Sequence, residues 1–248
     1  MLLETKIIIL HRFPYSDSSL IVRGFCSEFG VLSFLIKGAK RKDSPFKGAL
    51  DPLAESEIVF HNSGKSDLHF IREASLINWF PHLRKDLEKQ AMAEVMAEIL
   101  LRYVPSGLSL EREFGITEQA FQELDNGNRP EDSLARWLFQ ICDAAGYAIS
   151  LSECVRCGKT IPHIAADFLP EEGGCLCKEC LGIVSSHQPY SFLSDLQKLL
   201  LGETLSAPHV IENEFFKYLK THLGESREIK SFHWLQEVRN YAFSKTNS

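Results

Sequence analysis

The sequence lacks the long apolar segments that a membrane protein needs. None of its hydrophobic runs approaches about 18 residues, so no transmembrane helix is predicted. The first six residues also lack the basic and apolar regions of a secretory signal peptide. We therefore expect a cytoplasmic protein that does not contact membranes and whose cysteines stay reduced.

Motifs that indicate catalysis are absent as well. The chain contains no GxSxG, no P-loop, no GxGxxG and no HExxH, the patterns that mark hydrolase, nucleotide-binding and zinc-protease sites. Its nine histidines are scattered, and no nucleophile stands in an arrangement that predicts an adjacent base. The sequence therefore predicts a protein that is not an enzyme.

The chain has fewer positively than negatively charged side chains. The chain has 27 Lys and Arg against 33 Asp and Glu, and the net charge of −6 by itself argues against a nucleic-acid partner. The average conceals an asymmetry, because residues 1–80 carry +1 and the remainder −7. Residues 37–47 alone carry +4, which favours contact with phosphates, although such a run can also be a solvated loop. The basic residues of this segment are Lys37, Lys40, Arg41, Lys42 and Lys47.

Cysteine, in contrast, is well represented, and four of the seven cysteines form two CxxC pairs. Nineteen residues separate Cys154-x-x-Cys157 from Cys177-x-x-Cys180, which lies within the spacing of tetrathiolate zinc sites. Gly158 follows the first pair, where a tight turn is needed. Four thiolates leave zinc no open coordination position, so the sequence predicts a structural zinc ion.

Two residues offer alternative ligands. Cys175 could replace Cys177, although the CxxC spacing favours Cys177, and His163 could complete a Cys3His site. A redox function is less favoured, because neither pair opens a helix after a strand as in thioredoxin-like proteins. Cys26 and Cys142 are expected to be buried apolar side chains.

Hydrophobic periodicity predicts a β-rich first part. The expected strands are 5–13, 20–26, 30–36, 53–60 and 68–73, with a hairpin loop at 61–66. Five strands in about 75 residues suit a small barrel, a fold that often binds single strands. The basic segment follows the third strand, and Phe34 and Phe46 lie close to it in sequence as candidates for base stacking.

From Pro81 the periodicity becomes helical. The expected helices are 82–103, 109–125, 132–146, 191–201, 210–223 and 232–242. The cysteine-rich segment, about residues 152–182, interrupts them. The last residues, 244–248, are expected to be a frayed tail.

Three motifs in register resemble those of a known family. They are RFPYSDSSL at 12–20 with EFG at 28–30, KGAKRK at 37–42 with LDPL at 50–53, and CVRCG at 154–158 with GGCLCKEC at 173–180. In these motifs, and over nearly its whole length, the chain resembles the bacterial RecO family of recombination mediators. One departure is Cys26-Ser27, which stands where the family usually has a threonine.

The resemblance implies an α+β multidomain fold, with an N-terminal OB-fold β-barrel followed by an α-helical domain that carries an inserted four-Cys zinc knuckle. The expected domains are an OB-fold DNA-binding domain at 1–80, an α-helical domain at 81–150 and 183–248, and a zinc-binding insertion at 151–182. The resemblance also makes Cys177, rather than Cys175, the third zinc ligand.

The resemblance further implies a function in DNA repair and homologous recombination. RecO-like proteins bind single- and double-stranded DNA and anneal complementary strands. With RecR, they help load the recombinase RecA onto DNA coated by the single-stranded DNA-binding protein SSB, whose acidic C-terminal tail they engage. A cytoplasmic, nucleoid-associated location follows. The alternative is a zinc-ribbon and OB-like adaptor that binds only proteins and does not anneal DNA.

These expectations lead to a hypothesis for the DNA-binding residues. Phosphates are expected to contact the basic segment, and the candidates, of which the last three are the weaker, are Lys37, Lys40, Arg41, Lys42, Lys47, Arg12 and Arg23. The acidic C-terminal part is expected to bind proteins. Lys198, Lys217 and Lys220 are candidates there for contact with the acidic SSB tail.

Overall fold

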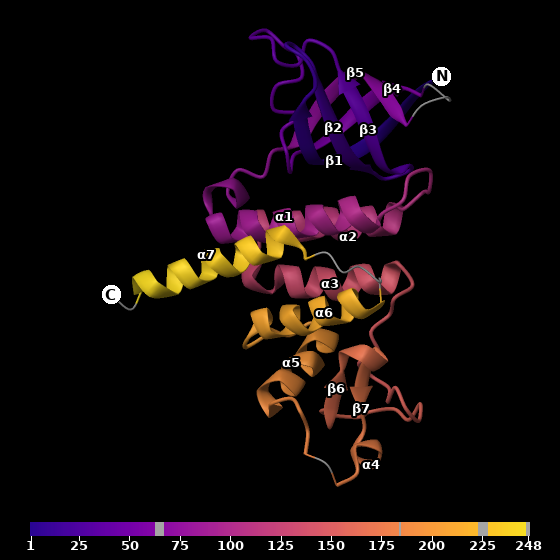
Figure 1. Cartoon of the computed structure of the whole chain (residues 1–248), viewed down its shortest axis with the longest axis vertical. Helices are drawn as coiled ribbons and strands as arrows, with labels where there is room; N and C mark the ends of the chain where they lie inside the picture. Colours follow the sequence, from indigo (N-terminus) through magenta and orange to yellow (C-terminus); the bar gives the residue numbers. More distant parts are fainter. Residues whose placement is uncertain (63–66, 184, 223–227, 247–248) are drawn as a thin grey trace. The chain divides into compact units, whose positions relative to one another are not determined.

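The computed structural model describes residues 1–62, 67–183, 185–222 and 228–246 (Figure 1). The chain forms two compact units, residues 1–128 with 229–248, and residues 129–228. The expected division into three domains stays a prediction. None of the helices in these ranges is long and apolar enough to span a membrane.

The first unit begins with a five-stranded barrel. Its strands are β1 (Leu2–Pro14), β2 (Leu20–Cys26), β3 (Gly30–Ile36), β4 (Glu55–His61) and β5 (Leu68–Asn78). β1 pairs antiparallel with both β2 and β4, and β3 pairs parallel with β5, so the strands close in the order β1-β2-β3-β5-β4 (Figure 1). This closed Greek-key arrangement confirms the expected OB-fold.

Alternating apolar residues explain why these strands form a barrel. Ile7, Ile9, Val22 and Phe34 belong to one buried cluster inside it, as the period of two in a strand requires. β1 is irregular after Ile9, and such bulges increase the strand's bend and twist. The long β1 can therefore pair with β4 along its first part and with β2 along its second.

The helices of the first unit are α1 (Leu87–Tyr103), α2 (Glu111–Asn126) and α7 (Lys230–Thr246). α1 starts later than expected, because Asp86 is extended and accepts hydrogen bonds from the first-turn N–H groups of Glu88 and Lys89. A separate 3-10 turn, Leu83–Lys85, takes the place of the expected first helical turn.

The C-terminal helix α7 packs along α1, far from it in sequence. The Glu98 carboxylate of α1 accepts hydrogen bonds from the backbone N–H and hydroxyl of Ser231, at 2.7 and 2.6 Å. The expected frayed tail is wrong for residues 244–246, which are helical, and the Lys245 ammonium lies 4.8 Å from the Tyr241 ring centre. Residues 247–248 lie outside the described part of the chain.

The second unit combines helices with a small sheet. Its elements are α3 (Ser133–Ala144), β6 (Asp167–Leu169), β7 (Gly174–Leu176), α4 (Lys178–Leu181), α5 (Tyr190–Leu201) and α6 (Pro208–His222). Trp137, Phe168 and Phe215 are fully buried in it. The 3-10 turns Pro130–Asp132 and Pro170–Glu172 complete the described elements of this unit.

Some predicted strand boundaries are confirmed, and others differ because of pairing between strands. β2 and β3 have the predicted bounds. β5 runs beyond the predicted end at Glu73 to Asn78, because its second half pairs with β4 as far as Glu55. Residues 63–66 of the predicted hairpin loop lie outside the described residues.

Candidate nucleic-acid interface and metal centre

The basic segment, residues 37–47, is a succession of turns between β3 and β4. Gly38 has φ +73°, a left-handed conformation that favours glycine. The N–H of Arg41 donates to the carbonyl of Gly38 at 3.0 Å, and that of Ser44 donates to Arg41 at 3.1 Å. The basic side chains of the segment, Lys37, Lys40, Arg41, Lys42 and Lys47, are all exposed.

Lys40 fastens this segment to the turn between β1 and β2. Its backbone N–H donates to the carbonyl of Ser18 at 3.1 Å, and its Nζ donates to the carbonyl of Ser16 at 2.6 Å. The β1–β2 loop of an OB-fold borders the surface that binds oligonucleotides. The contacts of Lys40 therefore place the basic segment beside that loop.

The two predicted arginines outside the segment have other partners. Arg12 forms an ion pair with Asp51 at 2.5 Å, and Asp51 also accepts a hydrogen bond from the Trp79 indole at 3.1 Å. Arg23 is partly buried and donates to the carbonyl of Leu101 in α1 at 3.4 Å. The structure thus brings together the five residues of the segment and directs Arg23 toward α1.

The aromatic residue beside the basic segment is not one of the two expected from sequence. Phe34 is fully buried in the barrel core and Phe46 packs against that core, so Phe34 offers no face for stacking. Phe70 of β5 is 37% exposed, and the Lys37 ammonium lies 5.9 Å from its ring centre. The alternation along β5, with His69 buried and Phe70 exposed, could have indicated that Phe70 is a surface residue. Its position near Lys37 could not be predicted from local sequence, because it depends on the parallel pairing of Phe70 with Leu35, which is distant in sequence.

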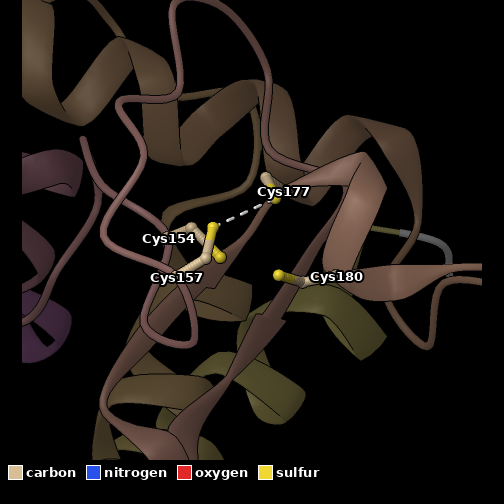
Figure 2. A group of neighbouring side chains, drawn as sticks. All are labelled: Cys154, Cys157, Cys177 and Cys180. Carbon is tan, nitrogen blue, oxygen red and sulfur yellow. Dashed lines mark hydrogen bonds between the residues drawn. The ribbon is translucent and has the colours of Figure 1, made fainter.

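The four predicted cysteine ligands converge in the second unit (Figure 2). Their sulfur atoms all lie within 4.8 Å of one another, and the sulfurs of Cys157 and Cys177 are 3.8 Å apart. A tetrahedron with metal–sulfur bonds of about 2.3 Å has edges of about 3.8 Å. The cluster formed by Cys154, Cys157, Cys177 and Cys180 therefore fits a tetrahedrally coordinated metal ion.

Local backbone structure prepares the first pair for this role. Gly158 has φ +71°, and its N–H donates to the carbonyl of Cys154 at 2.9 Å, which closes the turn. Burial disfavours ionisation of the Cys154 thiol, but backbone N–H groups of Cys177 and Arg156 donate to its sulfur and lower its pKa to about 6. A metal ligand must be a thiolate, and this environment favours one.

The alternative ligands lie outside the cluster. Cys175 is on β7 opposite Phe168, and burial raises the pKa of its thiol to about 12. Neither Cys175 nor His163 belongs to the group of described side chains that could share an ion. The structure thus favours the four cysteines of the two CxxC pairs.

Ion pairs occupy two of the cations around this cluster. Arg156 pairs with Glu172 at 2.6 Å, and Lys159 pairs with Glu179 at 2.5 Å. Such pairing reduces the positive potential that a phosphate would meet there. The described charges therefore favour the basic segment of the barrel, and not the cysteine cluster, as the surface for a polyanion.

Comparison with known proteins agrees with this architecture. The family description "Recombination protein O N terminal" matches residues 1–80, and "Recombination protein O C terminal" matches residues 84–230. A DNA repair protein RecO from Geobacter metallireducens is 30% identical over 179 residues, which cover 71% of this chain and 72% of the relative. One from Desulfatibacillum aliphaticivorans is 27% identical over 256 residues, which cover 96% and 98%. With a five-stranded barrel and a four-cysteine cluster in the matched regions, the chain belongs to the Recombination protein O (RecO) family, which supports a role in DNA repair and recombination.

Proposed function

We propose that the protein is a mediator of DNA repair and homologous recombination. In this proposal it binds single- and double-stranded DNA, anneals complementary strands and, with RecR, helps load RecA onto SSB-coated DNA. The observation that carries the proposal is the cluster of exposed cations in residues 37–47, fastened by Lys40 to the β1–β2 turn. Family membership supports the same function.

The proposed chemistry of the basic segment is neutralisation of phosphate charge. If about four cations each contact a phosphate of a single strand, the logarithm of the binding constant falls with the logarithm of salt concentration with a slope of about −3. Two strands held beside the same cations repel each other less, which is sufficient to accelerate annealing without a catalytic residue. Lys37, Lys40, Arg41 and Lys42 carry this role in the proposal, with Lys47, Arg12 and Arg23 as secondary contacts.

The metal in this proposal is Zn²⁺, and its role is structural. Four thiolates at tetrahedral spacing suit zinc and leave no position for a water or substrate. The ion would link the turn after β7 to the loop that precedes β6. These segments also contact each other through the Val155 N–H to Cys175 carbonyl hydrogen bond at 3.0 Å and the Lys159–Glu179 ion pair. Binding of the ion would therefore contribute directly to folding of this region.

In this proposal, ion pairing favours one of the three candidate lysines for contact with the acidic tail of SSB. Lys198 donates to Asp195 at 2.8 Å, and Lys217 donates to Glu214 at 2.6 Å. Lys220 is exposed at the last turn of α6 and has no ion pair among the described residues. Lys220 is therefore the candidate best able to receive a carboxylate of the tail.

The experiment that tests the proposed function is annealing of complementary single strands coated with SSB, with and without the protein. Faster annealing is expected, because the basic segment would reduce the repulsion between the two strands. A protein that binds only other proteins would not accelerate annealing. The assay is repeated with RecR, since RecR belongs to the proposed loading reaction. Absence of acceleration under both conditions, with the protein folded and metal-loaded, would favour the adaptor and overturn the proposal.

A further inference from the structure

A cavity of about 660 Å³ opens into the barrel between β3 and the start of β5. Its lining is mixed: Phe29, Val31 and Leu32 supply apolar surface, and Ser33, Asn62 and Asp67 supply polar groups. The volume lies within the range of about 300–1,000 Å³ typical of small-molecule sites. A lining that combines apolar side chains with several polar groups suits a flat heteroaromatic ligand whose edges form hydrogen bonds.

Backbone contacts hold this opening in place. β3 and β5 pair only from Ser33 to Leu35, so the first residues of β3 have no partner on β5. The loop after α1 takes that place instead: the N–H of Val31 donates to the Pro105 carbonyl at 3.3 Å, and the N–H of Gly107 donates to the Phe29 carbonyl at 2.8 Å. The edge of the cavity is therefore formed before any ligand arrives.

His69 lines this cavity with an unsatisfied ring nitrogen. His69 is only 7% exposed, and its ring centre lies 5.6 Å from that of Phe60 and 5.9 Å from that of Phe34. Burial lowers the pKa of the imidazole, against the opposing charge of Asp67. Its Nδ1 is buried and has no hydrogen-bond partner among the described residues. Buried polar atoms are rarely left unpaired, so this atom points to a missing partner.

The cavity adjoins the proposed DNA-binding surface along the same two strands. His69 and Phe70 are neighbours in β5, with the His69 ring inside the barrel and the Phe70 ring outside, next to Lys37. Ser33, at the cavity, is four residues before Lys37, which corresponds to roughly 13 Å along a strand. A single strand with one phosphate at Lys37 is therefore close enough to the cavity to place a neighbouring base in it.

We infer that this cavity takes up one unstacked base of a bound single strand, with a base face against the Phe29 ring and a base edge directed to His69 Nδ1. The inference rests on the proposed DNA-binding function and adds a contact to bases, which the basic segment cannot supply. A base is favoured over an acidic peptide because Asp67 borders the cavity while the base itself is uncharged. Inserted aromatic bases typically gain affinity without strong sequence preference.

The test compares two oligonucleotides of equal length, one with all its bases and one with a run of abasic residues, so that both carry the same phosphates. His69→Phe keeps the aromatic ring in the core and removes Nδ1. Ser106→Trp fills the cavity from an exposed loop residue. If His69→Phe fails to fold, Ser106→Trp still tests the inference. Ser75→Trp, at an exposed serine of β5 outside the cavity, is the matched control.

The wild-type protein is expected to bind the complete strand on the order of tenfold more tightly than the abasic strand. Both cavity variants should lower this ratio with an unchanged salt dependence, while Ser75→Trp keeps the wild-type ratio. The base preference that remains in the cavity variants is the stacking expected at Phe70. A wild-type ratio in both cavity variants would overturn the inference, as would loss of the ratio in Phe70→Ala alone. A salt slope of about −3 without any base preference would overturn the cavity site and leave the proposed function standing. No binding to either strand would overturn both.

Discussion

The sulfur of Cys157 lies 3.8 Å from the sulfur of Cys177, the edge length of a tetrathiolate zinc tetrahedron. The two cysteines belong to different turns, one in the loop before β6 and one at the start of α4. Each turn alone can offer two ligands, and only their juxtaposition completes a site for four.

Removal of one ligand should therefore release the metal. Cys177→Ser is expected to lose bound zinc during dialysis against a mild chelator and to lower the melting temperature, because metal binding and folding of this region are coupled. Metal content by mass spectrometry and thermal unfolding measure the two effects. Cys175→Ala is the control, since Cys175 is buried outside the cluster. Equal zinc retention by Cys177→Ser and the control would exclude Cys177 as a ligand.

Charge reversal in the basic segment should strongly weaken DNA binding without unfolding the barrel. Lys40→Glu with Arg41→Glu changes the local charge by four units on side chains that are exposed. Weaker binding and a smaller salt slope are expected, because phosphate contacts and counterion release are lost. Titration of a labelled single strand over a range of salt concentrations measures both quantities.

The matched control carries the same charge change elsewhere in the first unit. Lys85→Glu with Lys230→Glu alters two exposed lysines outside the basic segment. This control should keep most of the affinity at moderate salt, where charges beyond about 10 Å are screened. If the two double variants bind DNA equally well, net charge and not the basic segment governs binding.

The two phenylalanines near the basic segment should respond in opposite ways. Phe70→Ala is expected to weaken single-strand binding by up to about 1–3 kcal/mol through loss of a stacking surface, with little change in stability. Phe34→Ala removes a fully buried ring and should lower the free energy of unfolding by about 3–5 kcal/mol. Binding titrations and chemical denaturation separate the effects. Unaltered affinity in Phe70→Ala would remove it from the interface.

A buried carboxyl group between β4 and α2 predicts a pH dependence of stability. Glu55 is 1% exposed, and the Lys6 ammonium lies 3.8 Å from its carboxylate and 3.0 Å from that of Glu118. Burial, together with a hydrogen bond to Glu118, raises the pKa of Glu55 to about 7. The folded state therefore keeps a proton that the unfolded state releases near pH 4.5. Its contribution to stability is complete below that pH and is lost as pH rises through about 7.

Glu55→Gln should remove this dependence, because glutamine stays neutral. Between pH 5 and 8, the free energy of unfolding of the wild type should fall relative to that of the variant, as measured by denaturation at several pH values. Glu57→Gln is the control, since Glu57 is exposed on the same strand. Parallel pH profiles for the wild type and Glu55→Gln would show that Glu55 titrates normally.

The sequence by itself determined most of the elements and the cysteine cluster. Alternation predicted the bounds of β2, since a strand with one buried face must alternate, and the turn-like residues 27–29 predicted where β3 begins. The CxxC spacing likewise identified the cysteine cluster, because two ligands in one tight turn are a local property of the chain. Local chemistry of this kind does not depend on where distant segments lie.

Tertiary structure decided which side chains meet on the barrel. Phe34 was expected at the binding surface and lies in the core, whereas Phe70, thirty-six residues further along, lies beside Lys37. Phe70 lies beside Lys37 because β3 pairs in parallel with β5, and this pairing cannot be predicted from a local sequence pattern. The unsatisfied nitrogen of His69 and the raised pKa of Glu55 have the same origin, because burial depends on all the segments that pack around a residue.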